Sequence, residues 1–157
     1  MADKLLYTVQ DYHKKRIIID TDAACEADDP FAIAHALMSR MLDVRAVCAE
    51  HENEEPSEAV RFIIQEAERE SDNPLYVLCI GATTNVDKAL IIRPQIAQKM
   101  TIVTIGGSSV RCVAPWVNED TSYTYTEEGP KIKVYTSINS RFIIEDFICK
   151  LQILYPV

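Results

Sequence analysis

The sequence contains no apolar run that approaches the roughly 20 residues needed for a membrane-spanning helix, and its first residues lack the apolar stretch of a secretory signal peptide. It also has no clustered stripe of Lys and Arg, and its formal net charge is −8 at pH 7. This charge pattern excludes the electrostatic footprint that polymeric nucleic acid or an anionic membrane would require. The sequence therefore predicts a soluble, cytoplasmic protein with small-molecule or protein partners.

The cysteines form no Cys-x-x-Cys pair, which excludes the usual spacing of a zinc or dithiol redox centre. The chain has five cysteines, an odd number with wide spacing: Cys25, Cys48, Cys79, Cys112 and Cys149. We expect most of them to be buried thiols in a reducing compartment.

Short apolar runs alternate with helical patterns after a polar leader at residues 1–15. The runs predict strands at residues 17–19, 44–49, 75–80 and 101–105, and the patterns between them predict helices at 31–41, 57–70 and 85–92, with a helical turn after Pro94. Continuously apolar strands are typical of a parallel sheet that helices cover on both faces. A chain of 157 residues with 48% apolar content suffices for one core, so we expect a single α/β domain over residues 1–157.

Helical spacing also predicts which side chains face the core. The first helix would use Phe31, Ala34, Leu37 and Met38, and the second would use Val60, Ile63, Ile64 and Ala67. Towards the carboxyl end, alternating residues at 121–126 and 131–136 predict a β-hairpin. A final helix would follow a cap at Ser137 or Asn139.

Acidic residues gather where the first predicted strand ends. Residues 20–29 contain four aspartates and one glutamate. Because right-handed crossovers bring the carboxyl ends of parallel strands to one edge, we expect this loop to meet the loops at residues 50–55 and 81–85. Clustered carboxylates raise one another's pKa values unless a cation such as calcium or magnesium neutralises them.

Helix capping is the alternative explanation for these acids. Asp29 precedes Pro30, a favoured first helical residue, and a carboxylate there would satisfy free helix amides. Capping would explain one or two of the acids. It would not explain Asp20 and Asp22, which lie several residues before the predicted helix start.

Several motifs occur here in an order that resembles the nucleoside hydrolase family. The chain has D-x-D at residues 20–22 followed by D-D at 28–29, Gly-Ala-Thr-Thr-Asn-Val at 81–86, Arg-Pro-Gln-Ile-Ala at 93–97, and a strand ending in Gly-Gly at 106–107. The resemblance covers residues 16–109. It implies a Rossmann-like core and hydrolysis of the N-glycosidic bond of a ribonucleoside, with a calcium ion that holds the ribose hydroxyls and the attacking water.

The resemblance also implies roles for individual residues. Asp22 matches the aspartate that binds calcium and takes a proton from the water, Asp29 matches a second calcium ligand, and Thr84 matches the threonine whose main-chain carbonyl reaches the metal. Asp20 would support the loop. An oxocarbenium-like transition state gains from nearby carboxylates, and metal-bound water loses its proton more easily, so these residue types suit the chemistry.

Substrate binding would fall to Asp28 and Asn53, which match residues that contact the ribose. The chain departs from the family at two points. Residues 23–27 make the loop between D-x-D and D-D longer, with Cys25 where a divergent branch of the superfamily has Asn. The His-Asp pair that completes the calcium shell in the carboxyl-terminal half of family members has no counterpart, because His51 is the last histidine.

These departures leave three alternatives open. The chain is an active hydrolase whose site another chain completes, a short or truncated homologue with weakened or lost activity, or a non-catalytic module that binds metal or ribose and forms a homo-oligomer that covers the apolar surface of the absent half. A fourth alternative comes from residues 20–22, which also resemble the nucleophile motif of haloacid-dehalogenase-type phosphatases. That family has Thr or Val where Ala24 stands.

Overall fold

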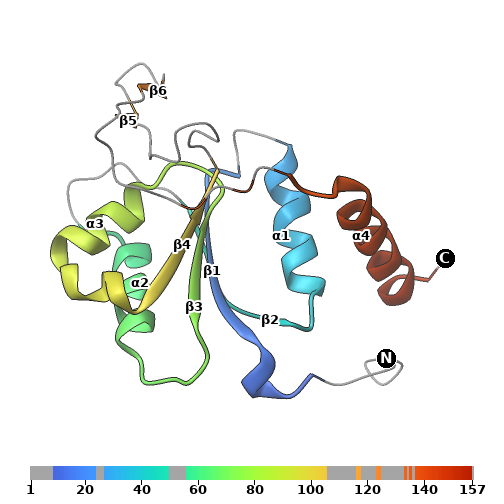
Figure 1. Cartoon of the computed structure of the whole chain (residues 1–157), viewed down its shortest axis with the longest axis horizontal. Coiled ribbons are helices and arrows are strands. Elements are labelled where there is room, and N and C mark those ends of the chain that lie inside the picture. The colour runs from blue at the N-terminus through green and yellow to red at the C-terminus, as the bar shows by residue number, and fades with distance from the viewer. Residues whose placement is uncertain are drawn as a thin grey trace. The chain divides into compact units, whose positions relative to one another are not determined.

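The computed structural model describes residues 9–23, 27–49, 56–105, 116–117, 123–124, 133, 135 and 137–156 (Figure 1). The chain divides into two compact units, Met1–Thr104 and Ile105–Val157. The single domain over residues 1–157 stays a prediction.

The first unit contains a four-stranded sheet in which all neighbouring strands are parallel, in the order β2-β1-β3-β4. A short 3-10 helix, η2 (Asp11–His13), precedes the sheet, whose strands are β1 (Lys15–Thr21), β2 (Leu42–Ala49), β3 (Leu75–Cys79) and β4 (Met100–Thr104). The predicted parallel α/β class is confirmed. β1 and β2 begin before their apolar runs because Lys15 and Leu42 already pair with each other.

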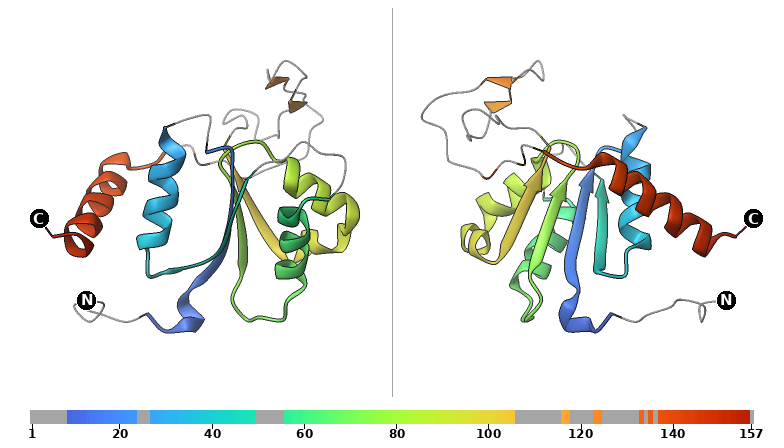
Figure 2. Two further views of the ribbon diagram at one scale, coloured as in Figure 1. Left: turned by 180° about the vertical axis from the view of Figure 1, so that it is seen from behind. Right: turned by 45° about the vertical axis from the view of Figure 1, so that its right-hand side comes forward.

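Helices cover both faces of this sheet. They are α1 (Asp28–Met38), α2 (Glu58–Glu68), α3 (Thr84–Ile92) and the 3-10 helix η3 (Pro94–Gln98). Figures 1 and 2 show α1 on one face and α2 with α3 on the other. Each of α1, α2 and α3 follows a strand, so all three begin near the carboxyl edge of the sheet, the edge at which the parallel strands end.

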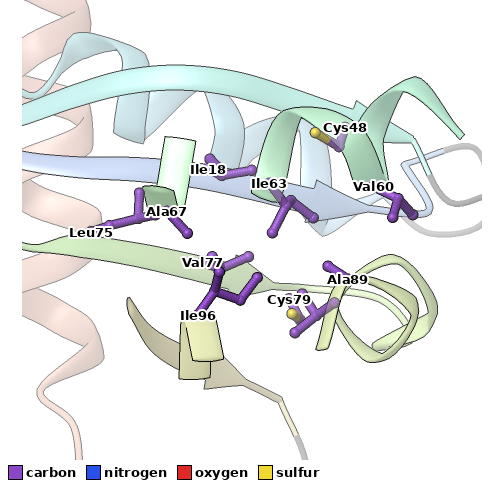
Figure 3. Close-up of a cluster of buried hydrophobic side chains, with 11 residues drawn as sticks. Ile18, Cys48, Val60, Ile63, Ala67, Leu75, Val77, Cys79, Ala89 and Ile96 are labelled. Atoms are coloured by element: carbon purple, nitrogen blue, oxygen red, sulfur yellow. The ribbon is translucent and has the colours of Figure 1, made fainter. Parts of the chain in front are cut away.

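The main hydrophobic core lies between the sheet and α2, α3 and η3 (Figure 3). Its buried members are Ile18, Cys48, Val60, Ile63, Ala67, Leu75, Val77, Cys79, Val86, Ala89 and Ile96. The predicted inner face of α2 is confirmed, since Val60, Ile63 and Ala67 are buried and Ile64 packs against the core.

The predicted inner face of α1 is wrong in part. Phe31 is 63% exposed and Leu37 is 61% exposed. The physical reason is the buried Asp29, which accepts a hydrogen bond from Thr21 of β1 and so fixes the rotation of the helix. Phe31 lies two residues after Asp29, which on a helix is nearly the opposite side.

The described residues of the second unit form one short antiparallel pair and one helix. β5 (Trp116–Val117) pairs with β6 (Tyr123–Thr124), and α4 (Ser140–Leu154) begins after Asn139, whose side chain accepts a hydrogen bond from the Phe142 amide. The Asn139 cap is confirmed. β6 lies within the first predicted hairpin strand at 121–126, but most of the second predicted strand at 131–136 lies outside the described residues, so the hairpin stays a prediction. No helix in the described ranges has the length and apolarity to cross a membrane.

A buried ion-pair network lies at the amino edge of the sheet. Glu66 of α2 contacts Arg16 of β1 at 2.9 Å and Arg45 of β2 at 3.1 Å. Arg69 approaches the same carboxylate oxygen at 3.4 Å. Arg16 also donates to the main-chain carbonyls of Glu66 and Asn73, so the side chains of both Arg16 and Glu66 are buried with partners.

We predict that Glu66→Ala lowers the free energy of unfolding by about 3–5 kcal/mol, because it leaves the buried Arg16 guanidinium without its carboxylate. Urea denaturation measures this. The matched control is Glu68→Ala on the same helix, whose carboxylate pairs with Arg93 at a partly exposed site and should cost no more than about 1 kcal/mol. Equal losses in the two variants would contradict the prediction.

Candidate functional site at the carboxyl edge

Asp20 lies near the end of β1 and is 0% exposed. In the parallel register it pairs with Cys48 of β2 and Cys79 of β3. Its Oδ1 accepts a hydrogen bond from Asn85 Nδ2 at 2.8 Å, while its Oδ2 is buried without a hydrogen-bond partner in the part of the chain that the structure describes. Burial raises the pKa of Asp20, and the hydrogen bond from Asn85 opposes this effect.

Asn85 connects the ends of several elements. It lies in the first turn of α3 and is 0% exposed. Its Nδ2 also donates to the carbonyl of Ala49 at the end of β2, at 3.1 Å. Its Oδ1 accepts from the hydroxyl of Ser57 at 3.2 Å, and Ser57 is the residue that caps α2.

Sequence reasoning assigned no role to Asn85 or Ser57. Asn85 enters the resemblance only as part of the motif at residues 81–86. The available signal was an amide directly before Val86 and four residues before Ala89, on the side of α3 that faces the core. A polar residue at such a position requires buried hydrogen-bond partners.

A second polar contact joins β1 to α1. The hydroxyl of Thr21 donates to Asp29 Oδ2 at 2.5 Å and accepts from the amide of Ala23 at 3.1 Å. The capping alternative for Asp29 is therefore wrong. α1 begins at Asp28, Pro30 is its third residue, and Ala27 at the cap position makes no side-chain cap bond. As acids in the first turn, Asp28 and Asp29 do interact favourably with the helix dipole.

The other predicted site residues fall at the same edge where they are described. Asp22 directly follows β1 and is partly exposed, Asp28 is exposed, and Thr84 is the partly buried first residue of α3. Asn53 lies outside the described residues, as do Cys25 and Gly106-Gly107. Across the described ranges, no three His, Cys, Asp or Glu side chains already form a group that could hold a metal ion. Calcium stays a prediction.

A cleft of about 460 Å³ opens between the end of β2 and the start of α2. It is lined by Ala46, Val47, Cys48, Ala49, Ser57, Glu58, Ala59 and Phe62. Its volume falls within the range typical of small-molecule sites. Because Ser57 and Ala49 both bond to Asn85, the cleft adjoins the buried hydrogen bonds of Asp20.

The environment of Cys48 follows from the same arrangement. Burial raises the pKa of the Cys48 thiol to about 11, and the negative charge of Asp20 contributes to the rise. Cys79 is also buried, whereas Cys149 on α4 is exposed. The expectation that most of the cysteines are buried therefore holds for two of the three described ones, Cys48 and Cys79. Cys25 and Cys112 lie outside the described residues.

The fold and this edge define a parallel α/β protein with a carboxylate-rich candidate site. No protein-family model matches the sequence, and no curated protein matches it. Among solved structures, the chain is similar to an "Inosine-Guanosine Nucleoside Hydrolase (IG-NH)", with 21% sequence identity and a TM-score of 0.48. The match covers 62% of this chain and 50% of that chain, so the likeness extends over half of the solved protein. A likeness of this size carries no assignment of activity.

We predict that an alkylating reagent at about pH 8 labels Cys149 in the folded protein and leaves Cys48 and Cys79 unlabelled, because only a thiolate in contact with solvent reacts. Peptide mass spectrometry measures the labelling of each residue. Protein unfolded in urea is the control, in which all three should react. Labelling of Cys48 as fast as Cys149 in the folded protein would contradict the described burial.

Proposed function

We propose that the carboxyl edge of the sheet binds a calcium ion and a ribonucleoside, and that the chain hydrolyses the N-glycosidic bond of that nucleoside to release base and ribose. The observation that carries the proposal is the buried Asp20, whose Oδ2 has no partner in the described structure. A buried carboxylate oxygen without a partner costs free energy. A cation with its bound waters, held by the adjacent aspartates, would supply both a counter-charge and hydrogen-bond donors.

The residues at this edge fit a calcium ion by their chemistry. Asp22, Asp29 and the main-chain carbonyl of Thr84 would hold it, and carboxylate and carbonyl oxygens are the ligands that this hard cation prefers. The hydrogen bond from Thr21 already orients the Asp29 carboxylate. A ligand that is oriented in advance loses less conformational freedom when the ion binds.

The aspartates would then divide the work of hydrolysis. A bound calcium ion would make a coordinated water easier to deprotonate. Asp22, which is partly exposed after β1, would accept the proton of the attacking water, and the exposed Asp28 would accept a hydrogen bond from a ribose hydroxyl. Asn53 would provide a further ribose contact. The negative charge of the carboxylates favours the oxocarbenium-like character of the transition state.

One observation favours binding without turnover as the second candidate function. The histidines of the described ranges, His13 and His35, lie in η2 and in the last turn of α1. Both positions are at the amino edge of the sheet, away from Asp22. The third histidine, His51, lies outside the described residues, so neither described histidine lies where an imidazole could protonate the leaving base. Release of free ribose from inosine with calcium, measured as reducing sugar, separates hydrolysis from binding alone, and release of phosphate with magnesium would indicate the phosphatase alternative.

We predict that metal-free protein binds calcium in a calorimetric titration and that Asp22→Ala weakens the affinity at least about tenfold, which corresponds to about 1.4 kcal/mol. The loss would follow from removing a charged ligand. Asp11→Ala is the control, because it removes the same charge from an exposed residue before β1. Unchanged calcium affinity in Asp22→Ala would reject the assignment.

We predict that Asp28→Ala weakens the binding of ribose to calcium-loaded protein and leaves calcium affinity nearly unchanged, because Asp28 would contact the sugar and not the ion. The same calorimetric cell measures both steps when ribose or inosine follows calcium. Equal ribose affinity in Asp28→Ala and the parent protein would remove Asp28 from the site.

A further inference from the structure

We propose that Asn85 is a positioning residue for the cation site. It holds Asp20 by one carboxylate oxygen and leaves the other available to a water bound to a cation at Asp22 and Asp29. This inference rests on the proposed function and adds to it a residue from α3. It also gives Asp20 a defined role as a hydrogen-bond acceptor in the outer layer of the site.

The hydrogen bonds of Asn85 fix the direction of its amide. Its nitrogen donates to Asp20 Oδ1 and to the Ala49 carbonyl, and its oxygen accepts from Ser57. The reverse orientation would place the amide oxygen against a carboxylate and a carbonyl, with no hydrogen to share. Asp20 Oδ1 therefore has a permanent donor, and only Asp20 Oδ2 is left to bind something else.

The partner of Asp20 is a neutral amide and not a cationic side chain, and this difference affects the charge of the site. At this buried position an arginine or lysine would neutralise the charge of Asp20, whereas a neutral donor satisfies one oxygen and leaves the charge in place. At the amino edge of the sheet, by contrast, cationic side chains do neutralise a carboxylate, because Arg16 and Arg45 contact Glu66. A carboxylate that keeps its charge and one unpaired oxygen is suited to a cation with its hydration water.

Asn85 also sets where Asp20 lies relative to the neighbouring elements. Its contacts reach β1 at Asp20, β2 at Ala49 and the start of α2 at Ser57. Partners in the outer layer of metal sites orient the ligands and usually change metal affinity when they are replaced. Loss of Asn85 would therefore release Asp20 at the point where β1 leads into Asp22.

The experiment is a calorimetric titration of the full metal-free chain with calcium alone. Asn85→Ala should raise the calcium Kd by about 10–100-fold. The control is Asn73→Ala, which removes an amide that donates to the carbonyl of Asp11 at 2.7 Å, before β1 begins. It should leave the calcium Kd unchanged. A purely structural role for Asn85 would lower the thermal unfolding midpoint without changing the Kd of the folded protein.

A milder variant keeps the test decisive if Asn85→Ala does not fold. Ser57→Ala removes one hydrogen bond to Asn85 together with the α2 cap, and it should raise the calcium Kd by less than Asn85→Ala. Asn139→Ala removes the corresponding side-chain cap of α4 and should not change the Kd. Calcium binding by the parent with an unchanged Kd in Asn85→Ala, or in Ser57→Ala if only that variant folds, would overturn this inference alone. No calcium binding by the parent would overturn the proposed function and this inference together.

Discussion

The hydrogen bond between Asn85 and Asp20 is the contact on which the carboxyl edge of the sheet depends. It joins the start of α3 to the end of β1, and the same amide reaches β2 at Ala49 and α2 at Ser57. A buried polar network is stable only when its members find partners of the correct kind. The Asn85 amide therefore fixes the relative positions of the ends of β1 and β2 and the starts of α2 and α3. The aspartates that follow β1 extend from this fixed position.

α2 is held in a similar way at both of its ends. Ser57 bonds to Asn85 at the carboxyl edge, and Glu66 bonds to Arg16 and Arg45 at the amino edge. Between these anchors the helix contributes apolar side chains to the core. Apolar packing has little directional preference, so the two polar anchors define the position of α2 along the strands. The cleft beside β2 owes its shape to this placement.

Local sequence patterns predicted the parallel sheet, its helices and the inner face of α2, because continuous apolar runs and helical spacing record burial directly. They could not predict the rotation of α1 about its axis. Helical spacing groups residues on the sides of a helix, but it does not determine which side faces the sheet. That choice is made by Asp29 and Thr21, eight residues apart. The partner of Asp20 is 65 residues away, and no local pattern encodes such a pair. The roles of Asp22, Asp28, Asp29, Thr84 and Asn53 stay predictions of the sequence resemblance.

The two edges of the sheet also differ in charge. Arg16, Arg45 and Arg69 gather around Glu66 at the amino edge, whereas Asp20, Asp22, Asp28 and Asp29 lie at the carboxyl edge. Within the first unit, this separation gives the sheet an electric polarity along its strands, superimposed on a chain whose formal net charge is −8. Such a field attracts cations more strongly towards the rim where the strands end than towards the other rim. Small cations would consequently arrive at the aspartates by electrostatic steering, at a rate that falls as dissolved salt screens the field.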